Sequence, residues 1–381
     1  MAIPVLHVCD KFGVAGSSIH GVSRLFSWWF PRFDPRFAVG LCGLKSPEPA
    51  SRLLEEQGVP VTHLGRSKFD PRILTDLVAL ARARGAQILH VHGYAAADFG
   101  RLAARRVGAA LILHEHFADP RMPAYQGVAD RVLAPFTDRA IAVSRSTADF
   151  LVRERHVPGD RVRLIWNGAP LDEFAPVGPG RARAVREALG LPMDAPVVGS
   201  IARLNEQKGH RYLIEAAAVV LSRRPDVRFL IVGDGDLAVP LREQARARGI
   251  GDQVVFAGHR TDVPDLLGAI DVFAISSVYE GTPLSLFEAM AAEKTIVSTA
   301  VDGCREVLEE GVSGLLVPPQ DPSALAAALL RVVQEPALAR RLAEGARRAS
   351  TRYDAAACVR QIEGLYDEVL AERKVRRGAA A

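Results

Sequence analysis

Residues 276–291, with the sequence SSVYEGTPLSLFEAMA, follow a short apolar run at Val272–Ile275. The run predicts a buried strand, and the residues from Pro283 onward predict a largely apolar helix. Glu280 lies in the loop between them, and Glu288 lies inside the helix among apolar neighbours. A carboxylate in such surroundings requires a polar partner, which ligand hydroxyls could supply. Because parallel sheets bind ligands beyond the carboxyl ends of their strands, this loop is the first candidate site.

The start of the predicted helix has the features of an anion site. Gly281 permits a close approach of the backbone to a ligand, Thr282 is a suitable N-cap residue, and Pro283 fits the first helical position. The first backbone N–H groups of a helix lack helical partners, and the helix dipole adds positive potential beside them. We therefore expect the N–H groups up to Leu284 to bind a negatively charged part of a ligand.

Short apolar runs alternate with helical stretches along the whole chain. In the N-terminal half the expected strands are residues 5–9, 38–41, 61–64, 88–92, 111–115, 140–143 and 162–165. In the C-terminal half they are residues 197–201, 229–233, 254–256, 272–275, 296–298 and 315–317. Near-continuous apolar strands separated by helices are typical of parallel sheets covered on both faces. The predicted fold class is therefore α/β, with two doubly wound, Rossmann-like domains.

A break between the two halves is expected in residues 168–180, where six of thirteen residues are glycine or proline. This composition is unsuited to a strand or helix interior and is typical of a linker. We therefore predict an N-terminal domain of residues 1–175 and a C-terminal domain of residues 176–355. Residues 356–381 are expected to form a final helix that crosses back to the N-terminal domain.

The composition excludes several classes of protein. Of the 381 residues, 49% are apolar and 24% are charged, a globular balance rather than that of a disordered or fibrous chain. No apolar run approaches the roughly 20 residues of a membrane span. The 48 basic residues include 42 arginines, but they are spread along the chain and the net charge is only +4. This distribution does not predict a nucleic-acid partner.

A second candidate site follows the first expected strand of the C-terminal half. The sequence GSIARLNEQKG, residues 199–209, places Arg203 and Lys208 between that strand and the next helix. Two cations around a helix start are suited to bind diphosphate oxygens by charge-assisted hydrogen bonds. An R-x4-K spacing is common by itself, so its position between strand and helix carries this prediction.

Three further loops contain candidate residues. Gly233 belongs to the sequence VGDGD, which fits a weak G-x-G-x-x-A dinucleotide pattern, but Asp234 and Asp236 would repel a pyrophosphate. Gly16 lies in the glycine-containing loop after the first strand, where the backbone can approach a ligand. His116 closes the sequence LHEH at the end of the fifth strand.

Together these motifs resemble the retaining glycosyltransferases of family 4, which have the GT-B fold. The resemblance extends over nearly the whole chain and is carried by the E-x7-E spacing of Glu280 and Glu288 and by the motif of Arg203 and Lys208. It implies two facing Rossmann-like domains with the site in the cleft between them. The N-terminal domain would bind the acceptor, and the C-terminal domain would bind the nucleotide-sugar donor.

The resemblance also implies a role for each candidate residue. Arg203, Lys208 and the helix start at residues 281–284 would bind the diphosphate. Glu280 and His116 would be the catalytic residues at the donor sugar. The remaining donor contacts would be Glu288 at the ribose hydroxyls, Gly16 near the phosphates, Gly233 in a turn lining the nucleotide pocket, and Arg260 at the nucleobase. The family usually has paired glycines in the first loop, whereas this chain separates Gly13 from Gly16.

The implied activity is transfer of a sugar, with its α configuration retained, to an acceptor hydroxyl with release of NDP. The donor would be a UDP-, GDP- or ADP-sugar, and the acceptor a cell-surface glycan, a glycolipid or a small metabolite. No cofactor and no metal ion are expected, because two cations and a helix start already neutralise the phosphate charge. Acceptor choice is expected to depend on the N-terminal loops at residues 10–30, 66–72, 93–99 and 117–130.

Other functions fit parts of the same sequence. A sugar-nucleotide epimerase of this fold would need acid–base carboxylates in both domains, and the N-terminal loops are poor in acids. A non-catalytic nucleotide-sugar-binding protein would not need both glutamates of the E-x7-E motif. The spacings His90-x-His92 and His114-x-His116 could bind a metal, because alternate residues of a strand share a face. No Asp/Glu cluster lies beside them in the sequence, which disfavours that interpretation.

The four cysteines are far apart and form no C-x-x-C pair, which favours a reduced, cytoplasmic protein. The aromatic run Trp28-Trp29-Phe30 has two interpretations. It could pack in the core of an N-terminal helix, or it could contact lipid and place the protein peripherally at the inner membrane face.

Overall fold

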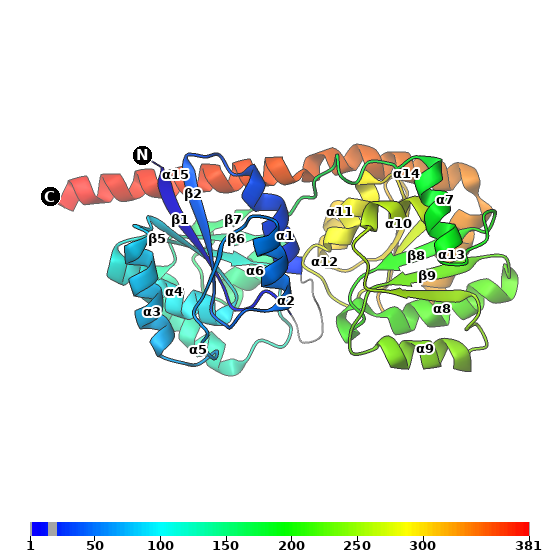
Figure 1. Ribbon diagram of the computed structural model, residues 1–381, viewed down its shortest axis with the longest axis horizontal. Helices are drawn as coiled ribbons and strands as arrows, with labels where there is room; N and C mark the ends of the chain where they lie inside the picture. The colour runs from blue at the N-terminus through cyan, green and yellow to red at the C-terminus, as the bar shows by residue number, and fades with distance from the viewer. Residues whose placement is uncertain (1, 14–20, 381) are drawn as a thin grey trace. The chain divides into compact units, whose positions relative to one another are not determined.

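The computed structural model describes residues 2–13 and 21–380, which form two compact units. Unit 1 comprises Met1–Asn167 and Ala355–Ala381, and unit 2 comprises Gly168–Asp354. The chain therefore leaves unit 1, forms all of unit 2, and returns to unit 1 in the C-terminal helix α15 (Ala355–Ala380), drawn red in Figure 1.

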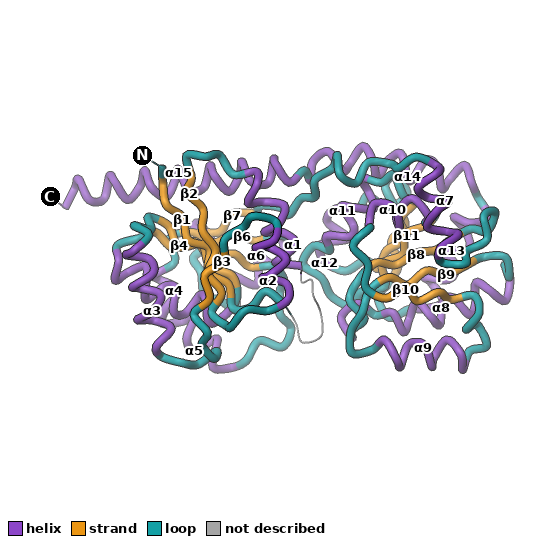
Figure 2. The backbone as a smooth tube through the Cα atoms, viewed as in Figure 1, coloured by secondary structure: helices purple, strands orange, loops and turns teal. Residues whose placement is uncertain are grey.

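Unit 1 contains a parallel sheet, whose strands are orange in Figure 2. The described residues build it from seven strands in the order β3-β2-β1-β4-β5-β6-β7. The strands are β1 (Ile3–Cys9), β2 (Phe37–Gly43), β3 (Val61–His63), β4 (Ile88–His92), β5 (Ala110–Glu115), β6 (Arg139–Ala142) and β7 (Val162–Leu164). Every strand expected in the N-terminal half is thus confirmed, with shifts only at the strand ends. The strand order reverses between β1 and β4, the position at which doubly wound sheets bind ligands.

The helices of unit 1 cover both faces of this sheet. They are α1 (Gly21–Trp29), α2 (Pro49–Glu56), α3 (Arg72–Ala83), α4 (Tyr94–Val107), α5 (Ala124–Leu133), α6 (Arg145–Arg153) and α15, with the short 3-10 helices η1 (Phe30–Arg32), η2 (Ala134–Phe136) and η3 (Gly159–Arg161). Leu89 and Val91 of β4 face a core shared with α3 and α4. His90, between them, faces the opposite way and is hydrogen-bonded to Tyr366 of α15. Trp28 and Trp29 are buried, so these two rings pack in the interior of unit 1 rather than on its surface.

Unit 2 contains a second parallel sheet, with the order β10-β9-β8-β11-β12-β13 within the described residues. Its strands are β8 (Val197–Ile201), β9 (Arg228–Val232), β10 (Val254–Gly258), β11 (Val272–Ile275), β12 (Thr295–Thr299) and β13 (Leu315–Val317). All strands expected in the C-terminal half are therefore confirmed. Here the order reverses between β8 and β11, so the loops after these two strands meet at the reversal.

The helices of unit 2 again lie on both sides of the sheet. They are α7 (Pro179–Ala188), α8 (His210–Arg223), α9 (Ala238–Ala247), α10 (Val263–Ala269), α11 (Leu284–Ala291), α12 (Asp302–Val307), α13 (Pro322–Gln334) and α14 (Pro336–Ser350), with η4 (Glu206–Lys208) and η5 (Thr351–Tyr353). The apolar faces of α8, α9 and α13 pack on one side of the sheet and form its main core. Across the described chain, no helix combines the length and the apolar character needed to cross a membrane.

Candidate functional site

Two loops of unit 2 are tied together at the carboxyl ends of β8 and β11. The backbone N–H of Val278, in the loop after β11, donates to the carbonyl of Gln207 at 2.8 Å. The hydroxyl of Ser276 donates to the carbonyl of Lys208 at 2.9 Å. These two bonds hold the R-x4-K loop against the E-x7-E loop, although the motifs are far apart in the sequence.

Lys208 and Glu280 form an ion pair at this junction. The ammonium group of Lys208 is hydrogen-bonded to Oε1 of Glu280, and the two side chains are only 16% and 5% exposed. The hydroxyl of Ser277 donates to the same oxygen at 2.8 Å, and Nε2 of Gln207 donates to Oε2 at 3.5 Å. The carboxylate is therefore oriented by three groups, and charge-assisted bonds of this kind are stronger than neutral ones.

Gly209 makes this geometry possible. Its φ is +61°, and a Cβ at this position would lie 2.1 Å from the carbonyl oxygen of Ser276. Only glycine therefore fits between the two loops. On the other side of Lys208, the side-chain oxygen of Asn205 accepts the Lys208 N–H at 3.3 Å and caps η4. The position of the Lys208 backbone thus depends on Asn205 before it and Gly209 after it.

Arg203 lies in the same loop, half-buried, and its guanidinium has no hydrogen-bond or ion-pair partner in residues 2–13 and 21–380. Burial lowers the pKa of Arg203, and the negative charge of Glu280 acts in the opposite direction. A partly desolvated guanidinium without a partner is an available binding group for an anion.

Helix α11 (Leu284–Ala291) begins later than the sequence predicts. Pro283, with φ −68° and ψ 126°, is the N-cap residue, and no side chain of the described residues caps the helix, so the expected N-cap role of Thr282 is wrong. The extended loop is held against α12, since a Cβ on Gly303 would lie 1.6 Å from the carbonyl oxygen of Gly281. The backbone is extended at Pro283, and helical conformation starts at Leu284.

Glu288 is fully buried within α11, which excludes an exposed helix acid. A small pocket opens close to the same helix, at the ends of β8 and β11. Its lining includes Lys208 and Ser277 together with Pro283 and Ser285 at the start of α11. The pocket therefore joins the cation of the first motif to the helix start of the second.

Gly233 and Arg260 occupy the neighbouring loops of unit 2. Gly233 has φ +134°, and a Cβ here would lie 1.9 Å from the carbonyl oxygen of Ala202, so the loop packs directly against the start of the R-x4-K loop. Its N–H donates to the carbonyl of Gly258 at 2.8 Å. Arg260 forms a two-point ion pair with Asp262, with Nε to Oδ1 at 2.8 Å, and this pairing raises the pKa of Arg260. The guanidinium expected at the nucleobase is therefore already engaged by Asp262.

Unit 1 contributes His116, which directly follows β5. Nε2 of His116 lies 3.0 Å from Nδ1 of His92, and Nδ1 of His116 is buried without a hydrogen-bond partner in the described chain. Burial lowers the pKa of His116 to about 4, so the ring is neutral at pH 7. Gly16 falls outside the described residues. A neutral imidazole with one open nitrogen can exchange one hydrogen bond with a ligand hydroxyl.

Several residues that organise these loops were not identified from the sequence. Ser277 and Gln207 orient Glu280. Both lie inside the two motifs, so their positions in the sequence could have identified them as candidates. Glu48 accepts the backbone N–H groups of Phe12 and Gly13 at 2.7 and 2.9 Å and so holds the loop after β1. Nothing in the sequence marks Glu48, because the contact joins residues of two different loops.

Two family models match the chain. The model described as Glycosyltransferase Family 4 matches residues 31–173, and the model described as Glycosyl transferases group 1 matches residues 182–349. Alpha-D-kanosaminyltransferase of Streptomyces kanamyceticus is 29% identical over 316 residues, which are 78% of this chain and 81% of that protein. UDP-Gal:alpha-D-GlcNAc-diphosphoundecaprenol alpha-1,3-galactosyltransferase of Escherichia coli is 28% identical over 280 residues, 71% of this chain and 72% of that protein.

Solved structures match both units. Anabaena Alr3699/HepE in complex with UDP superposes with a TM-score of 0.83 at 23% identity, covering 96% of this chain and 100% of that one. The same protein in complex with UDP-glucose gives a TM-score of 0.83 at 22% identity and the same coverage. This likeness confirms the predicted fold class, two Rossmann-like α/β units of the GT-B type. Since family models match both halves of the chain and the motif residues of unit 2 meet at one point, the chain belongs to glycosyltransferase family 4, a family of retaining enzymes.

Proposed function

We propose that this glycosyltransferase moves a sugar from a UDP-sugar to an acceptor hydroxyl, with its α configuration retained and UDP released. The observation that carries the proposal is the meeting of Lys208, Glu280 and the unpartnered Arg203 at the carboxyl ends of β8 and β11. Uridine is supported by the HepE complexes with UDP and UDP-glucose and by the relative named for UDP-Gal. GDP- and ADP-sugars are the alternative donors.

Unit 2 is proposed to bind the diphosphate of the donor through the positive charges of Arg203 and Lys208. Arg203 needs no partner to be displaced before it binds phosphate, whereas the diphosphate would compete with Glu280 for Lys208. The backbone N–H groups at the start of α11 would share the same charge. Once Lys208 has turned to the diphosphate, the Glu280 carboxylate would oppose the positive charge that develops on the sugar as the bond to the leaving group breaks.

The remaining roles follow the family resemblance. Glu288 would bind the ribose hydroxyls, Gly233 would line the nucleotide pocket, and Arg260 would contact the nucleobase from its ion pair with Asp262. In unit 1, His116 would contact the donor sugar through its open Nδ1, and Gly16 would approach the phosphates. Residues 1–175 would bind an acceptor from the classes named above, and we propose a cytoplasmic enzyme, consistent with its four free cysteines.

A screen of nucleotide sugars tests the proposed function. UDP-sugars are expected to raise the melting temperature of the protein, because a ligand that binds only the folded state stabilises it by mass action. The donor found in this way is then incubated with and without candidate acceptors while NDP release is measured. Binding without any transfer would favour a binding protein, and conversion of the donor to its epimer without an acceptor would favour an epimerase.

Arg203→Ala is expected to weaken UDP binding by about 1.5–3 kcal/mol, or roughly 10- to 150-fold in Kd, because a charge-assisted contact to phosphate is lost. Calorimetric titration of UDP measures this change. Arg223→Ala is the matched control, since Arg223 is exposed at the end of α8. Wild-type UDP affinity in both Arg203→Ala and Lys208→Ala would contradict the diphosphate assignment.

Transfer is expected to continue in excess EDTA. The positive charge needed at the leaving diphosphate is available from Arg203, Lys208 and the α11 start. Within the described residues, the group with metal-ligand spacing is a histidine cluster of unit 1, and no such group lies at the unit 2 site. Initial rates with and without EDTA test this point, and a loss of activity that Mg²⁺ or Mn²⁺ restores would contradict it.

A further inference from the structure

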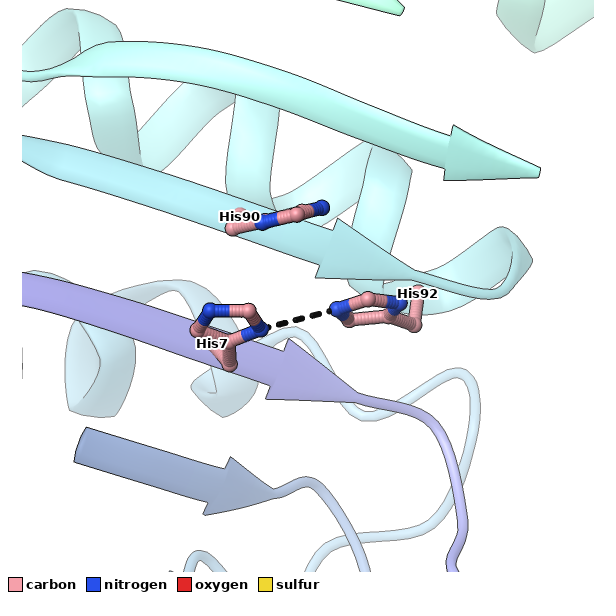
Figure 3. A group of neighbouring side chains, drawn as sticks. All are labelled: His7, His90 and His92. Carbon is pink, nitrogen blue, oxygen red and sulfur yellow. Dashed lines mark hydrogen bonds between the residues drawn. The ribbon is translucent and has the colours of Figure 1, made fainter. Parts of the chain in front are cut away.

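Five histidines lie on one face of the unit 1 sheet. His7 of β1 pairs in register with His90 of β4, and His92 of β4 pairs with His114 of β5, two residues before His116. Their neighbours on each strand face the opposite side, toward the core shared with α3 and α4. The rings of successive histidines stack, with His114 and His116 centroids 4.5 Å apart. Figure 3 shows His7 on β1 opposite His90 and His92 on β4.

Hydrogen bonds join these five rings and Tyr366 of α15 into one chain. His116 Nε2 lies 3.0 Å from His92 Nδ1, and His92 Nε2 lies 3.1 Å from His7 Nδ1, the bond dashed in Figure 3. The Tyr366 hydroxyl then lies 3.0 Å from His7 Nε2 and 2.7 Å from His90 Nδ1. The last bond joins His90 Nε2 to His114 Nδ1 at 3.1 Å.

All five rings are neutral near pH 7. Burial lowers the pKa of His7 to about 3 and that of His116 to about 4, and it lowers the pKa values of His90, His92 and His114 well below the ordinary range. A neutral imidazole has one N–H donor and one acceptor nitrogen, and a tyrosine hydroxyl has one donor proton. The proton positions along the chain are therefore not independent.

The pattern of contacts leaves two arrangements in which every bond has one donor and one acceptor. Each histidine pair joins an Nδ1 to an Nε2, and Tyr366 joins His7 Nε2 to His90 Nδ1. If His92 carries its proton on Nδ1, each bond in turn forces the next, and all five histidines carry the proton on Nδ1. If His92 carries it on Nε2, all five carry it on Nε2.

We propose that Tyr366 and this histidine chain fix the tautomer of His116, which makes Tyr366 a positioning residue for the sugar contact made by His116. The open Nδ1 of His116 is a donor in one arrangement and an acceptor in the other. Changing between them requires the protons of five rings and one hydroxyl to move together. The hydrogen-bonding role of His116 toward its ligand is therefore set by the arrangement that the whole chain adopts: a donor when all five histidines carry the proton on Nδ1, and an acceptor when all carry it on Nε2. The functional part of this inference rests on the proposed role of His116, whereas the shared tautomer does not.

A bound metal is the competing explanation of the cluster. Single ligand nitrogens of His7, His90 and His92 lie within 4.8 Å of one another. However, both ring nitrogens of each of these three histidines already take part in the hydrogen-bonded chain. A metal would have to replace several of these bonds, so the hydrogen-bonded chain accounts for the cluster better.

The tautomers can be measured directly on the full-length protein. Nitrogen NMR of ¹⁵N-histidine-labelled protein distinguishes protonated from unprotonated ring nitrogens. We expect the five histidines of the chain to show one and the same tautomer at pH 7. Mixed tautomers among the five would overturn the proposal, and so would stoichiometric zinc or nickel in the purified protein by elemental analysis. Neither measurement depends on a variant that folds or on enzyme activity.

Tyr366→Phe tests the link through α15. Without the hydroxyl, the segment His116–His92–His7 and the segment His90–His114 no longer constrain each other, so we expect the two segments to cease sharing one tautomer. Val369→Ala is the control, because Val369 is buried on the same helix and belongs to none of these hydrogen bonds. If all five histidines keep the wild-type tautomer in Tyr366→Phe, Tyr366 is not the link.

The kinetic result separates this inference from the proposed function. We expect Tyr366→Phe to lower kcat by roughly three- to tenfold with little change in donor KM, as expected for one hydrogen bond that matters in the transition state. Val369→Ala should not lower kcat selectively over donor KM. Normal transfer by His116→Ala would reject the proposed role of His116 while leaving the tautomer result standing. A mixed-tautomer result would reject the chain while leaving the proposed transfer reaction intact.

Discussion

Glu280→Gln is expected to lower kcat for sugar transfer by roughly 100- to 1,000-fold, the usual effect of removing one electrostatic group aimed at transition-state charge. Glutamine keeps the size of the side chain and can still accept the bond from Ser277, but it deletes the negative charge. UDP affinity should be unchanged or higher, because Lys208 loses the carboxylate with which it pairs and becomes available to phosphate. The loss should therefore fall in kcat rather than in nucleotide binding.

Transfer assays with the identified donor, alongside calorimetric titration of UDP, measure both quantities. Glu206→Gln is the matched control: it makes the same change of charge at an exposed position in the same loop as Lys208 and should behave as wild type. A parallel fall of UDP affinity and activity in Glu280→Gln would assign Glu280 to nucleotide binding instead. Melting temperatures of both variants show whether the half-buried Lys208, left without its ion-pair partner, destabilises the fold.

His116→Ala, in unit 1, is also expected to lower kcat without lowering UDP affinity. The substitution removes the open imidazole nitrogen proposed to bond the sugar, while the cations proposed to bind UDP lie in unit 2. The kcat should fall while the Kd for UDP stays close to that of wild type. A lower UDP affinity that accounts for the whole loss would place His116 at the nucleotide rather than at the sugar.

Unit 1 is expected to unfold in mild acid, well before unit 2. Each of the five chain histidines has a folded-state pKa below the ordinary value of about 6.5. Below that pH the unfolded chain binds protons that the folded chain excludes, so the free energy of unfolding falls as the pH falls. For each pH unit below about 6.5, each histidine lowers the free energy of unfolding by about 1.4 kcal/mol. At pH 5.5 the five histidines together lower it by about 7 kcal/mol.

Buried carboxyl groups of unit 1 act in the opposite direction. Burial raises the pKa of Glu115 to about 7, against the effect of its ion pair with Arg155, and raises the pKa of Asp98 to about 6. These groups bind protons in the folded state first, so they stabilise it by about 3 kcal/mol at pH 5.5. Burial also raises the pKa of Asp10, which acts in the same direction as Glu115 and Asp98. The net loss at pH 5.5 is therefore below about 4 kcal/mol, and it grows at lower pH, against a typical domain stability of about 5–15 kcal/mol.

Tryptophan fluorescence reports this transition selectively, because Trp28, Trp29 and Trp166 all belong to unit 1. Far-UV circular dichroism follows both units. Unit 2 contains one histidine of the same kind, His210, whose pKa burial lowers to about 3, so its transition should lie at lower pH. His259→Gln, at an exposed position, should leave both transitions unchanged. Fluorescence that is insensitive to pH between 7 and 4.5 would contradict the prediction.

Strand positions could be predicted from the sequence because each strand is a contiguous run with its own pattern. The run at residues 88–92 shows this well, since the apolar residues and the strand observed as β4 coincide. Helix starts were less predictable. The N-cap role of Thr282 failed because the backbone stays extended at Pro283, which is the N-cap residue, in a loop where Gly281 packs against Gly303, twenty-two positions further along. A local pattern contains no information about such a contact.

The sequence by itself determined the two parallel sheets and the motifs of a family 4 glycosyltransferase, because each strand and each motif is a short, contiguous segment. Only the tertiary structure decided what those residues touch. Lys208 and Glu280 are 72 positions apart, and their pairing depends on the close packing of two loops around Gly209. Tyr366 and His7 are 359 positions apart. Their contact arises because parallel pairing sets histidines of β1, β4 and β5 side by side and α15 returns to cover that face, so strand register and helix packing, not sequence spacing, created the histidine chain.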